Sequence, residues 1–189
     1  MEESDEQLVG WSQAGDPAAF VELFSRHGPA VHAYLVRRTG RQDADDLLSE
    51  VWLRAFESRG NYDRRCLDAR PWLYGIARHV LYAHWHRTAR PVWPASGPVA
   101  LDCWAEVDAR LDAAAQRAAL VQALASLPEG EREVLLLVVW EQLTPAEVAV
   151  ALGIPQGTAR SRLHRALVAL RTDVVPGSSV LPRLCPKEA

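Results

Sequence analysis

The segment LTPAEVAVALGIPQGTARSRLHRALVALR, residues 143–171, constrains the fold more than any other feature of the sequence. Thr144 can cap a helix in which Pro145 is the first residue and Glu147 returns a hydrogen bond to the cap, a capping box. Gly153 ends this helix, because glycine adopts a positive φ without steric cost. A tight turn and a second helix follow. The segment therefore predicts a helix-turn-helix, a motif that places its second helix in the major groove of DNA.

The second helix of this motif is basic and amphipathic. Between residues 155 and 172 the sequence has four arginines and no acidic residue. If the leucines at 163, 167 and 170 face the core, the helical repeat places a polar face opposite them. This face carries Thr158, Ser161, His164 and Arg165, and Arg160 and Arg162 flank it. The alternative is an ordinary helix with a solvated basic side, but the coincidence of capping box, glycine turn and charge segregation favours contacts with base edges and phosphates.

Composition and length limit the other function classes. The chain has 189 residues, 49% of them hydrophobic and 24% charged, which fits one large or two small folded domains. No apolar run approaches the ~20 residues of a membrane span, and the acidic start MEESDEQ is unlike a secretory signal, so we expect a cytoplasmic protein without membrane insertion. Three scattered cysteines form no disulfide framework, and no cysteine–histidine spacing fits a metal site. We therefore expect no metal and no cofactor.

The net charge of −3 hides an alternation along the chain. Residues 1–60 have 11 acidic and 6 basic residues, residues 61–90 have 2 and 6, and residues 91–154 have 9 and 3. Two basic segments, 61–90 and 155–172, therefore interrupt an acidic chain. A protein that contacts nucleic acid at two separate places would have this charge pattern, and so would a protein with two unrelated solvated basic faces.

Helical periodicity dominates the sequence and predicts an all-α protein of two small helical domains joined by a flexible linker. Prolines and glycines mark the linker and the tail. The predicted division is a first domain at 6–87, a linker at 88–110, a second domain at 111–172 and a disordered tail at 173–189. Before the helix-turn-helix, the predicted helices are one that starts at the cap Asp16 and others at about 29–39, 43–56, 70–87, 113–125 and 128–140.

The sequence from about Phe20 to Arg171 resembles the extracytoplasmic-function (ECF, group 4) RNA polymerase sigma factors of the sigma-70 family. Three strings carry the resemblance: DADDLLSEVWLRAF is similar to region 2.2, WLYGIAR to the start of region 2.3, and GIPQGTARSRLHRAL to region 4.2. The resemblance implies a region 2 helical bundle and a four-helix region 4. It also implies a protein that binds core RNA polymerase and directs it to promoters through their −10 and −35 elements.

The string DADDLLSEVWLRAF has a polar stripe beside an apolar one. Its charged residues at 43, 46, 50 and 54 follow helical steps and share one face. The resemblance implies that this helix docks on the β′ clamp helices of polymerase, where charge pairs set orientation and association rate more than affinity. The expected polymerase-binding residues are Asp43, Asp46, Leu47, Glu50, Val51 and Arg54.

The basic segment at 58–87 is implied to bind the −10 element and to hold an extruded base beside the loop that precedes region 2.3. Amide and phenol groups can read a base edge, and arginine can hold phosphate. The residues expected at this site are Asn61, Tyr62, Arg64, Arg65, Arg70, Arg78, His79 and Arg87. The family often has Asn and Asp where this chain has His79 and Ala83, so its base preferences do not transfer directly. For Trp72 and Trp85 we favour burial in the core over stacking on DNA.

Region 4.2 is implied to read the −35 element. The residues expected there are Gln156, Thr158, Arg160, Ser161, His164 and Arg165. The implied partners are promoter DNA and core RNA polymerase, contacted at the β′ clamp helices and the β flap. An anti-sigma factor is a common partner in the family, and no residue of this sequence identifies one.

A second function class fits part of the sequence. A helix-turn-helix transcriptional regulator that does not recruit core polymerase would use 143–171 in the same way. Only a sigma factor gives a use to 43–56 and to the loop at 58–70. An enzyme has little support, because the chain lacks a Gly-rich phosphate loop, an H-E-x-x-H motif and a G-x-S-x-G motif, and we expect no catalytic residue.

Overall fold

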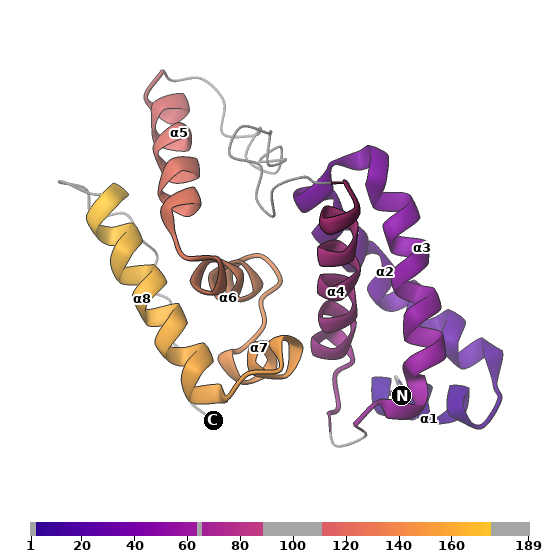
Figure 1. Cartoon of the computed structure of the whole chain (residues 1–189). Coiled ribbons are helices and arrows are strands. Elements are labelled where there is room, and N and C mark those ends of the chain that lie inside the picture. Colours follow the sequence, from indigo (N-terminus) through magenta and orange to yellow (C-terminus); the bar gives the residue numbers. More distant parts are fainter. Residues whose placement is uncertain (1–2, 64–65, 89–110, 175–189) are drawn as a thin grey trace.

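The computed structural model describes residues 3–63, 66–88 and 111–174. These residues form eight α-helices and one 3₁₀ turn, without a β-strand (Figure 1), so the all-α prediction is confirmed. The helices are α1 (Asp5–Gln13), α2 (Pro17–Thr39), α3 (Arg41–Ser58), α4 (Arg70–Thr88), α5 (Leu111–Ser126), α6 (Glu129–Val139), α7 (Pro145–Leu152) and α8 (Gln156–Val174), and the turn is η1 (Arg59–Asn61). We call α1–α4 the N-terminal bundle and α5–α8 the C-terminal bundle. Figure 1 shows them on the right and on the left.

Helix α2 runs unbroken through Pro29, so the prediction of two helices in this segment is wrong. A proline inside a helix removes one backbone hydrogen bond and crowds the preceding turn, at a cost of about 3 kcal/mol. The helix continues because it buries Leu23 before the proline and Val31 and Tyr34 after it. Each such side chain contributes about 1.5–3 kcal/mol when buried, which together exceeds the cost of the proline.

Helix α1 lies outside every predicted helix. Ser4 Oγ accepts the N–H of Gln7 at 3.3 Å, and Gln7 Oε1 accepts the N–H of Ser4 at 3.0 Å, which makes a capping box. Leu8 and Val9 pack into the core from this helix. The S-x-x-Q spacing at 4–7 is therefore the sequence signal that identifies its start.

The C-terminal bundle agrees with the predicted order of helices. Thr144 and Glu147 form the expected capping box at the start of α7, and Gly153 ends this helix with φ of 63°. Helix α8 packs on α5, α6 and α7. Leu124, Leu135, Leu136 and Ala166 form a core within this bundle.

The two bundles also share a hydrophobic core that continues from α4 into α7. Leu73 and Ala77 of α4 belong to the same buried cluster as Val148 and Ala151 of α7. A Cβ atom at Gly75 would lie 3.0 Å from the backbone oxygen of Ala151, so the close approach of these helices depends on glycine. The bundles are therefore packed against each other.

The predicted flexible linker and disordered tail fall largely outside the described residues. The predicted linker begins at Thr88, the last residue of α4, and its remainder at 89–110 is not described. The predicted tail at 173–189 is described only to Val174, where α8 ends. No helix within the described ranges has the length and apolar character needed to cross a membrane.

Candidate functional site

The acidic stripe predicted on α3 lies at the surface. Asp46 is exposed, whereas Glu50 is half-buried and paired with two arginines. Its carboxylate lies 2.6 Å from Arg54 Nη2 and 3.6 Å from Arg87 Nη2. Asp43 Oδ2 lies 3.5 Å from His84 Nε2. The stripe is therefore partly neutralised by the N-terminal bundle itself, and Asp46 is its most accessible acid.

Leu47 and Val51 do not lie on this surface, which corrects the prediction that they bind polymerase directly. Their exposed fractions are 3% and 0%, because α3 packs both side chains against α2 and α4. Leu53 instead is 59% exposed. The helical repeat places it on the outward side of α3, near Asp46 and Glu50. Sequence reasoning missed Leu53 because a leucine beside an apolar stripe is normally assigned to the core.

The loop before α4 separates the predicted −10 residues into exposed and buried ones. Asn61 ends η1 and is exposed. Tyr62 is only 5% exposed, its hydroxyl donates to the backbone oxygen of Cys66, and its ring meets Trp72 edge-on at 5.2 Å. Burial, together with nearby negative charge, raises the pKa of Tyr62. Tyr62 therefore supports the loop and cannot read a base in this arrangement, which corrects its predicted role.

The remaining −10 candidates lie in three different environments. Arg64 and Arg65 fall outside the described residues. Arg70 is held by Asp68, with Nη2 2.7 Å from the carboxylate. Arg87 is exposed at the end of α4 and contacts Glu50. The structure therefore does not gather all the predicted −10 residues on one open surface.

Arg78 and His79 are neighbours on α4 with different surroundings. The Arg78 guanidinium lies 4.5 Å from the centre of the Tyr82 ring, in a pocket that Glu129 and Glu133 of the C-terminal bundle also line. His79 is exposed. Partial burial and the charges of Arg78 and Arg54 lower the pKa of His79, so at neutral pH its imidazole is uncharged and offers one donor and one acceptor.

The two tryptophans behave as expected for core residues. Trp85 is buried and contacts Tyr82 edge-on, and Trp72 is half-buried against Tyr62. The burial of Trp85 leaves it no open face for stacking on a base.

The predicted −35 face of α8 is exposed in the structure. Gln156, Arg160, Ser161 and His164 are exposed, and Thr158 is half-buried. On the opposite side, Ala159 and Ala166 are fully buried and the leucines at 163, 167 and 170 are half-buried. The predicted orientation of this helix is confirmed.

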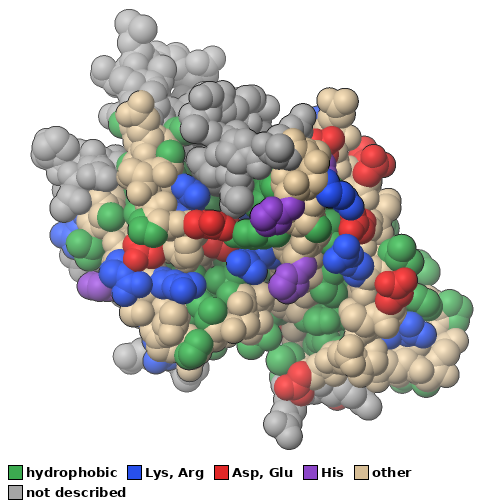
Figure 2. Space-filling model, in the orientation of Figure 1, with side chains coloured by type: hydrophobic (Ala, Val, Ile, Leu, Met, Phe, Trp, Pro, Cys, Tyr) green, Lys and Arg blue, Asp and Glu red, His purple; other side chains and the backbone are tan. Residues whose placement is uncertain are grey.

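Two arginines of α8 are turned toward α6. Arg165 Nε lies 2.6 Å from Glu131 Oε1, which fixes its position while its side chain stays 56% exposed. Arg162 lies against Gly130, where an added Cβ would meet its Nη1 at 3.1 Å. Arg160 is therefore the arginine at the N-terminal end of α8 that this packing leaves exposed. Figure 2 shows one group of basic and histidine side chains over α4 and α3, and another over α8.

A network of charged and phenolic groups joins the bundles. Glu141, between α6 and α7, accepts a hydrogen bond from Arg37 at 2.6 Å and another from Tyr74 at 3.0 Å. Arg38 Nη2 lies 3.5 Å from Glu133, and its guanidinium lies 3.7 Å from the centre of the Tyr34 ring. The arginines and tyrosines belong to the N-terminal bundle and the glutamates to the C-terminal one. The contact between bundles is thus electrostatic as well as apolar.

Comparison with known proteins identifies both bundles. The family description "Sigma-70 region 2" matches residues 23–91, and "Sigma-70, region 4" matches residues 117–170. The chain is 31% identical over 169 residues to the ECF RNA polymerase sigma factor SigL of Mycobacterium tuberculosis, which covers 86% of this chain and 93% of SigL. A regulator with only a helix-turn-helix would not match region 2, so the alternative function is not supported.

Two solved structures have a similar fold. CnrH, in complex with the cytosolic domain of CnrY, has a TM-score of 0.63 at 22% identity and covers 90% of this chain and 96% of that chain. The sigma factor RpoE of Bartonella quintana, in complex with the anti-sigma factor NepR, has a TM-score of 0.58 at 20% identity and covers 81% and 94%. The chain therefore belongs to the extracytoplasmic-function sigma factors of the sigma-70 family, non-enzymatic proteins that bind core RNA polymerase and direct it to promoters through −10 and −35 elements.

Proposed function

We propose that the outward side of α3 is the surface through which this sigma factor binds the β′ clamp helices of core polymerase. Three exposed or half-exposed groups support the assignment: the acids Asp46 and Glu50 and the apolar side chain of Leu53. An interface with an apolar centre and charged neighbours combines area burial with electrostatic orientation. Co-elution of the full chain with core polymerase in gel filtration, followed by transcription from promoter DNA, tests the overall function.

We propose a −10 site formed by Asn61 and His79, with Arg64, Arg65, Arg70, Arg78 and Arg87 as candidates for phosphate contacts. Asn61 and the uncharged His79 both offer a donor and an acceptor from exposed positions, as base reading requires. Arg78 becomes available only when the C-terminal bundle moves away, because Glu129 and Glu133 border its pocket.

Separate substitutions of Asn61 and Tyr62 are expected to have different effects. Asn61→Ala should reduce opening of promoter DNA and leave the melting temperature unchanged, because the side chain is exposed. Tyr62→Ala should lower the free energy of unfolding by about 3 kcal/mol, because it empties a buried site. Permanganate reactivity of promoter thymines measures opening, and thermal unfolding measures stability. Normal opening by Asn61→Ala would move the reading site to His79.

We propose that the −35 element is read by the face of α8 that carries Gln156, Thr158, Arg160, Ser161, His164 and Arg165. The support is their common face and the positive charge of this helix. Arg160 is the proposed base reader, since Arg165 is already paired with Glu131. The β flap of polymerase is the proposed second partner of this bundle.

Arg160→Ala is expected to reduce discrimination among −35 sequences by about 5- to 150-fold, which corresponds to the 1–3 kcal/mol of a bidentate contact with a base. A binding series on promoter fragments that differ only in the −35 element measures the ratio. Arg171→Ala is the matched control, because Arg171 is also exposed on α8 but lies three turns further along. An equal loss of affinity for every sequence would make Arg160 a phosphate contact instead.

We propose that 6–87 acts as region 2 and 111–172 as region 4, and that the two bundles separate on the promoter. The −10 and −35 elements lie roughly 25 base pairs apart, about 85 Å along B-DNA. The contact at Gly75 holds α4 of one bundle against α7 of the other, so we propose that this contact is released when both elements are bound. The segment 88–110 can extend to at most about 80 Å, which permits separate docking.

We further propose that the protein works in the cytoplasm, where core polymerase and promoter DNA are found. An anti-sigma factor is a proposed additional partner, because a sigma factor of similar fold has been solved with one. Retention of an anti-sigma factor from the same organism on the immobilised full chain tests this partner.

A further inference from the structure

Helix α1 contacts both ends of the loop that carries the proposed −10 reader Asn61. This helix, at residues 5–13, precedes the part of the chain that matches sigma-70 region 2, which begins at residue 23. The contacts join α1 to Arg59, where the loop begins, and to Ala69, which directly precedes α4. The described parts of the loop are 59–63 and 66–69. We call these two parts the loop flanks.

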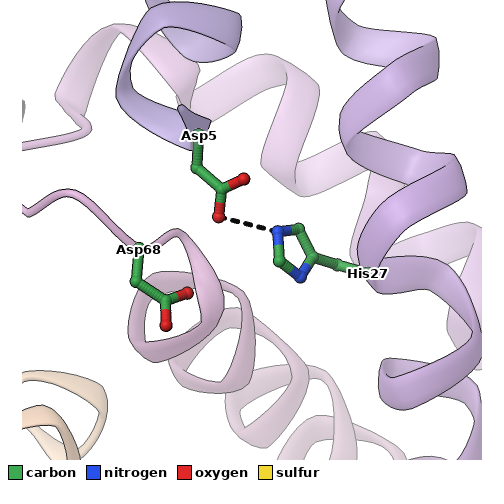
Figure 3. A group of neighbouring side chains, drawn as sticks. All are labelled: Asp5, His27 and Asp68. Atoms are coloured by element: carbon green, nitrogen blue, oxygen red, sulfur yellow. Dashed lines mark hydrogen bonds and ion pairs between the residues drawn. The ribbon is translucent and has the colours of Figure 1, made fainter. Parts of the chain in front are cut away.

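At the second flank, Asp5 supplies a hydrogen-bond acceptor for the start of α4. Its Oδ2 accepts the N–H of Ala69 at 2.9 Å and lies 2.7 Å from His27 Nε2 (Figure 3), and its Oδ1 accepts a bond from Arg26 at 2.8 Å. The first N–H groups at a helix start lack partners within the helix; Asp68 accepts the N–H of Arg70, and Asp5 accepts that of Ala69. An element more than 60 residues away in sequence thus contributes one of the two side-chain acceptors at this helix start.

The carboxylate of Asp5 is stable in its buried position. Burial raises the pKa of Asp5. The opposing effects are larger and bring the pKa down to about 2: hydrogen bonds from His27, from the N–H of Ala69 and from Arg26, and the charge of His27. Asp5 is therefore ionised throughout the neutral range, where it can hold all three partners.

The cluster of Asp5, His27 and Asp68 has ligand atoms close enough for a metal ion, but its donors and acceptors are already used. Asp5 holds Arg26, His27 and Ala69, and Asp68 accepts bonds from the backbone N–H and the guanidinium of Arg70. A cation would have to displace two arginines. The arrangement in Figure 3 therefore fits a structural junction better than a metal site.

At the first flank, the end of α1 holds the backbone of Arg59. Gln13 Nε2 donates to the Arg59 oxygen at 2.6 Å, and Arg59 Nε donates to the Ser12 oxygen at 3.4 Å. Ser12 is buried, which keeps this end of α1 in place. Asn61 lies two residues after Arg59, at the end of η1.

We propose that α1 is a brace that holds both loop flanks at a fixed separation, with Asp5 and Gln13 as positioning residues for −10 recognition. The proposal rests on the proposed role of the loop in reading the −10 element. Because base reading depends on the placement of Asn61 to within a fraction of a hydrogen-bond length, release of either flank should weaken discrimination between bases. It should not affect α3 or α8, which α1 does not contact through these bonds.

The test is transcription in vitro by holoenzyme reconstituted with the full chain, on a promoter library randomised at both elements, with sequencing of the transcripts. Asp5→Asn and Gln13→Ala are expected to reduce the preference at −10 positions about fivefold. Gln13→Ala removes the hydrogen bond to Arg59, and Asp5→Asn leaves a single acceptor oxygen where the carboxylate now uses one oxygen for Arg26 and the other for Ala69. The preference at −35 positions and co-elution with polymerase should stay unchanged. A loss of folded protein would lower all transcripts alike, so the −10 profile separates positioning from stability.

Ser4→Ala is the matched control in α1, because it removes the helix cap and leaves the bonds to the loop intact. Its −10 profile should equal that of the wild type. If Asp5→Asn does not fold, Gln13→Ala carries the test, since Gln13 is part of no ion pair in the described residues. An unchanged −10 profile in Gln13→Ala and Asp5→Asn, beside a flattened one in Asn61→Ala, would overturn the brace.

Two other results would also overturn the proposal. If Asn61→Ala leaves the −10 profile unchanged, the loop is not the reader, and the brace fails together with that assignment. If zinc chloride raises the melting temperature of the wild-type chain but not that of His27→Gln, the cluster in Figure 3 is a metal site instead.

Discussion

Asp46→Lys is expected to weaken binding to core polymerase by about tenfold or more. Asp46 is the most accessible acid of the α3 stripe, and a lysine there would oppose the basic side chains that the proposed interface requires. Like charges placed across an interface cost several kcal/mol, and they slow the diffusional encounter as well. Titration of labelled polymerase with the variant measures the change in affinity, and circular dichroism checks that its helicity equals that of the wild type.

Asp45→Lys is the matched control for this variant. Asp45 directly precedes Asp46 on α3, and its replacement by lysine makes the same change in charge. Its carboxylate lies toward α2, 2.9 Å from His32 Nε2. A variant with lysine at both 46 and 50 would be less informative, because Glu50 also holds Arg54 and Arg87. Equal affinity of Asp46→Lys and the wild type would place the polymerase contact on another surface. A deficit that is equal in both single variants would indicate a general charge effect.

Local signals predict α7 and α8 well. Their signals are the capping box at Thr144, the glycine at 153 and the charge pattern that follows. All three act within a few residues of chain, so the local sequence is sufficient to predict these two helices. The face of α8 follows from the helical repeat alone. The continuity of α2 through Pro29 does not, because tertiary burial on both sides of the proline overrides the local preference.

The details of the site depend on contacts between distant residues. Tyr62 has the chemistry of a base reader, and only its packing against Trp72 shows that it supports the loop instead. Asp5 reaches Ala69, and Arg37 reaches Glu141, across long stretches of chain that have no common motif. Pairs of this kind cannot be found from periodicity or spacing, because the local sequence around each partner looks like that of an ordinary surface residue.

Glu141→Ala is expected to destabilise the contact between the bundles by about 3–5 kcal/mol. The Glu141 side chain is 2% exposed and is the shared partner of Arg37 and Tyr74, with Arg38 Nη1 3.9 Å away. Removing one partner of a buried ion pair leaves the other charge without compensation, which costs far more than the loss of a surface pair. Because Glu141 belongs to one bundle and its partners to the other, we expect separation of the bundles rather than loss of helices. Small-angle X-ray scattering should show a larger radius of gyration at unchanged helicity.

Glu131→Ala is the control within the C-terminal bundle. Its bond to Arg165 is at the surface and joins α6 to α8, so its loss should cost at most about 1 kcal/mol and leave the radius of gyration unchanged.

If the promoter requires separated bundles, a weaker contact between the bundles increases the fraction of chains that are ready to bind. The apparent dissociation constant for polymerase and promoter is inversely proportional to that fraction, so it then falls. Glu141→Ala should therefore bind promoter-loaded polymerase more tightly than the wild type. An unchanged radius would show that the apolar contact of α4 with α7 is sufficient to hold the bundles together. Weaker binding by a chain with separated bundles would contradict the proposed opening on the promoter.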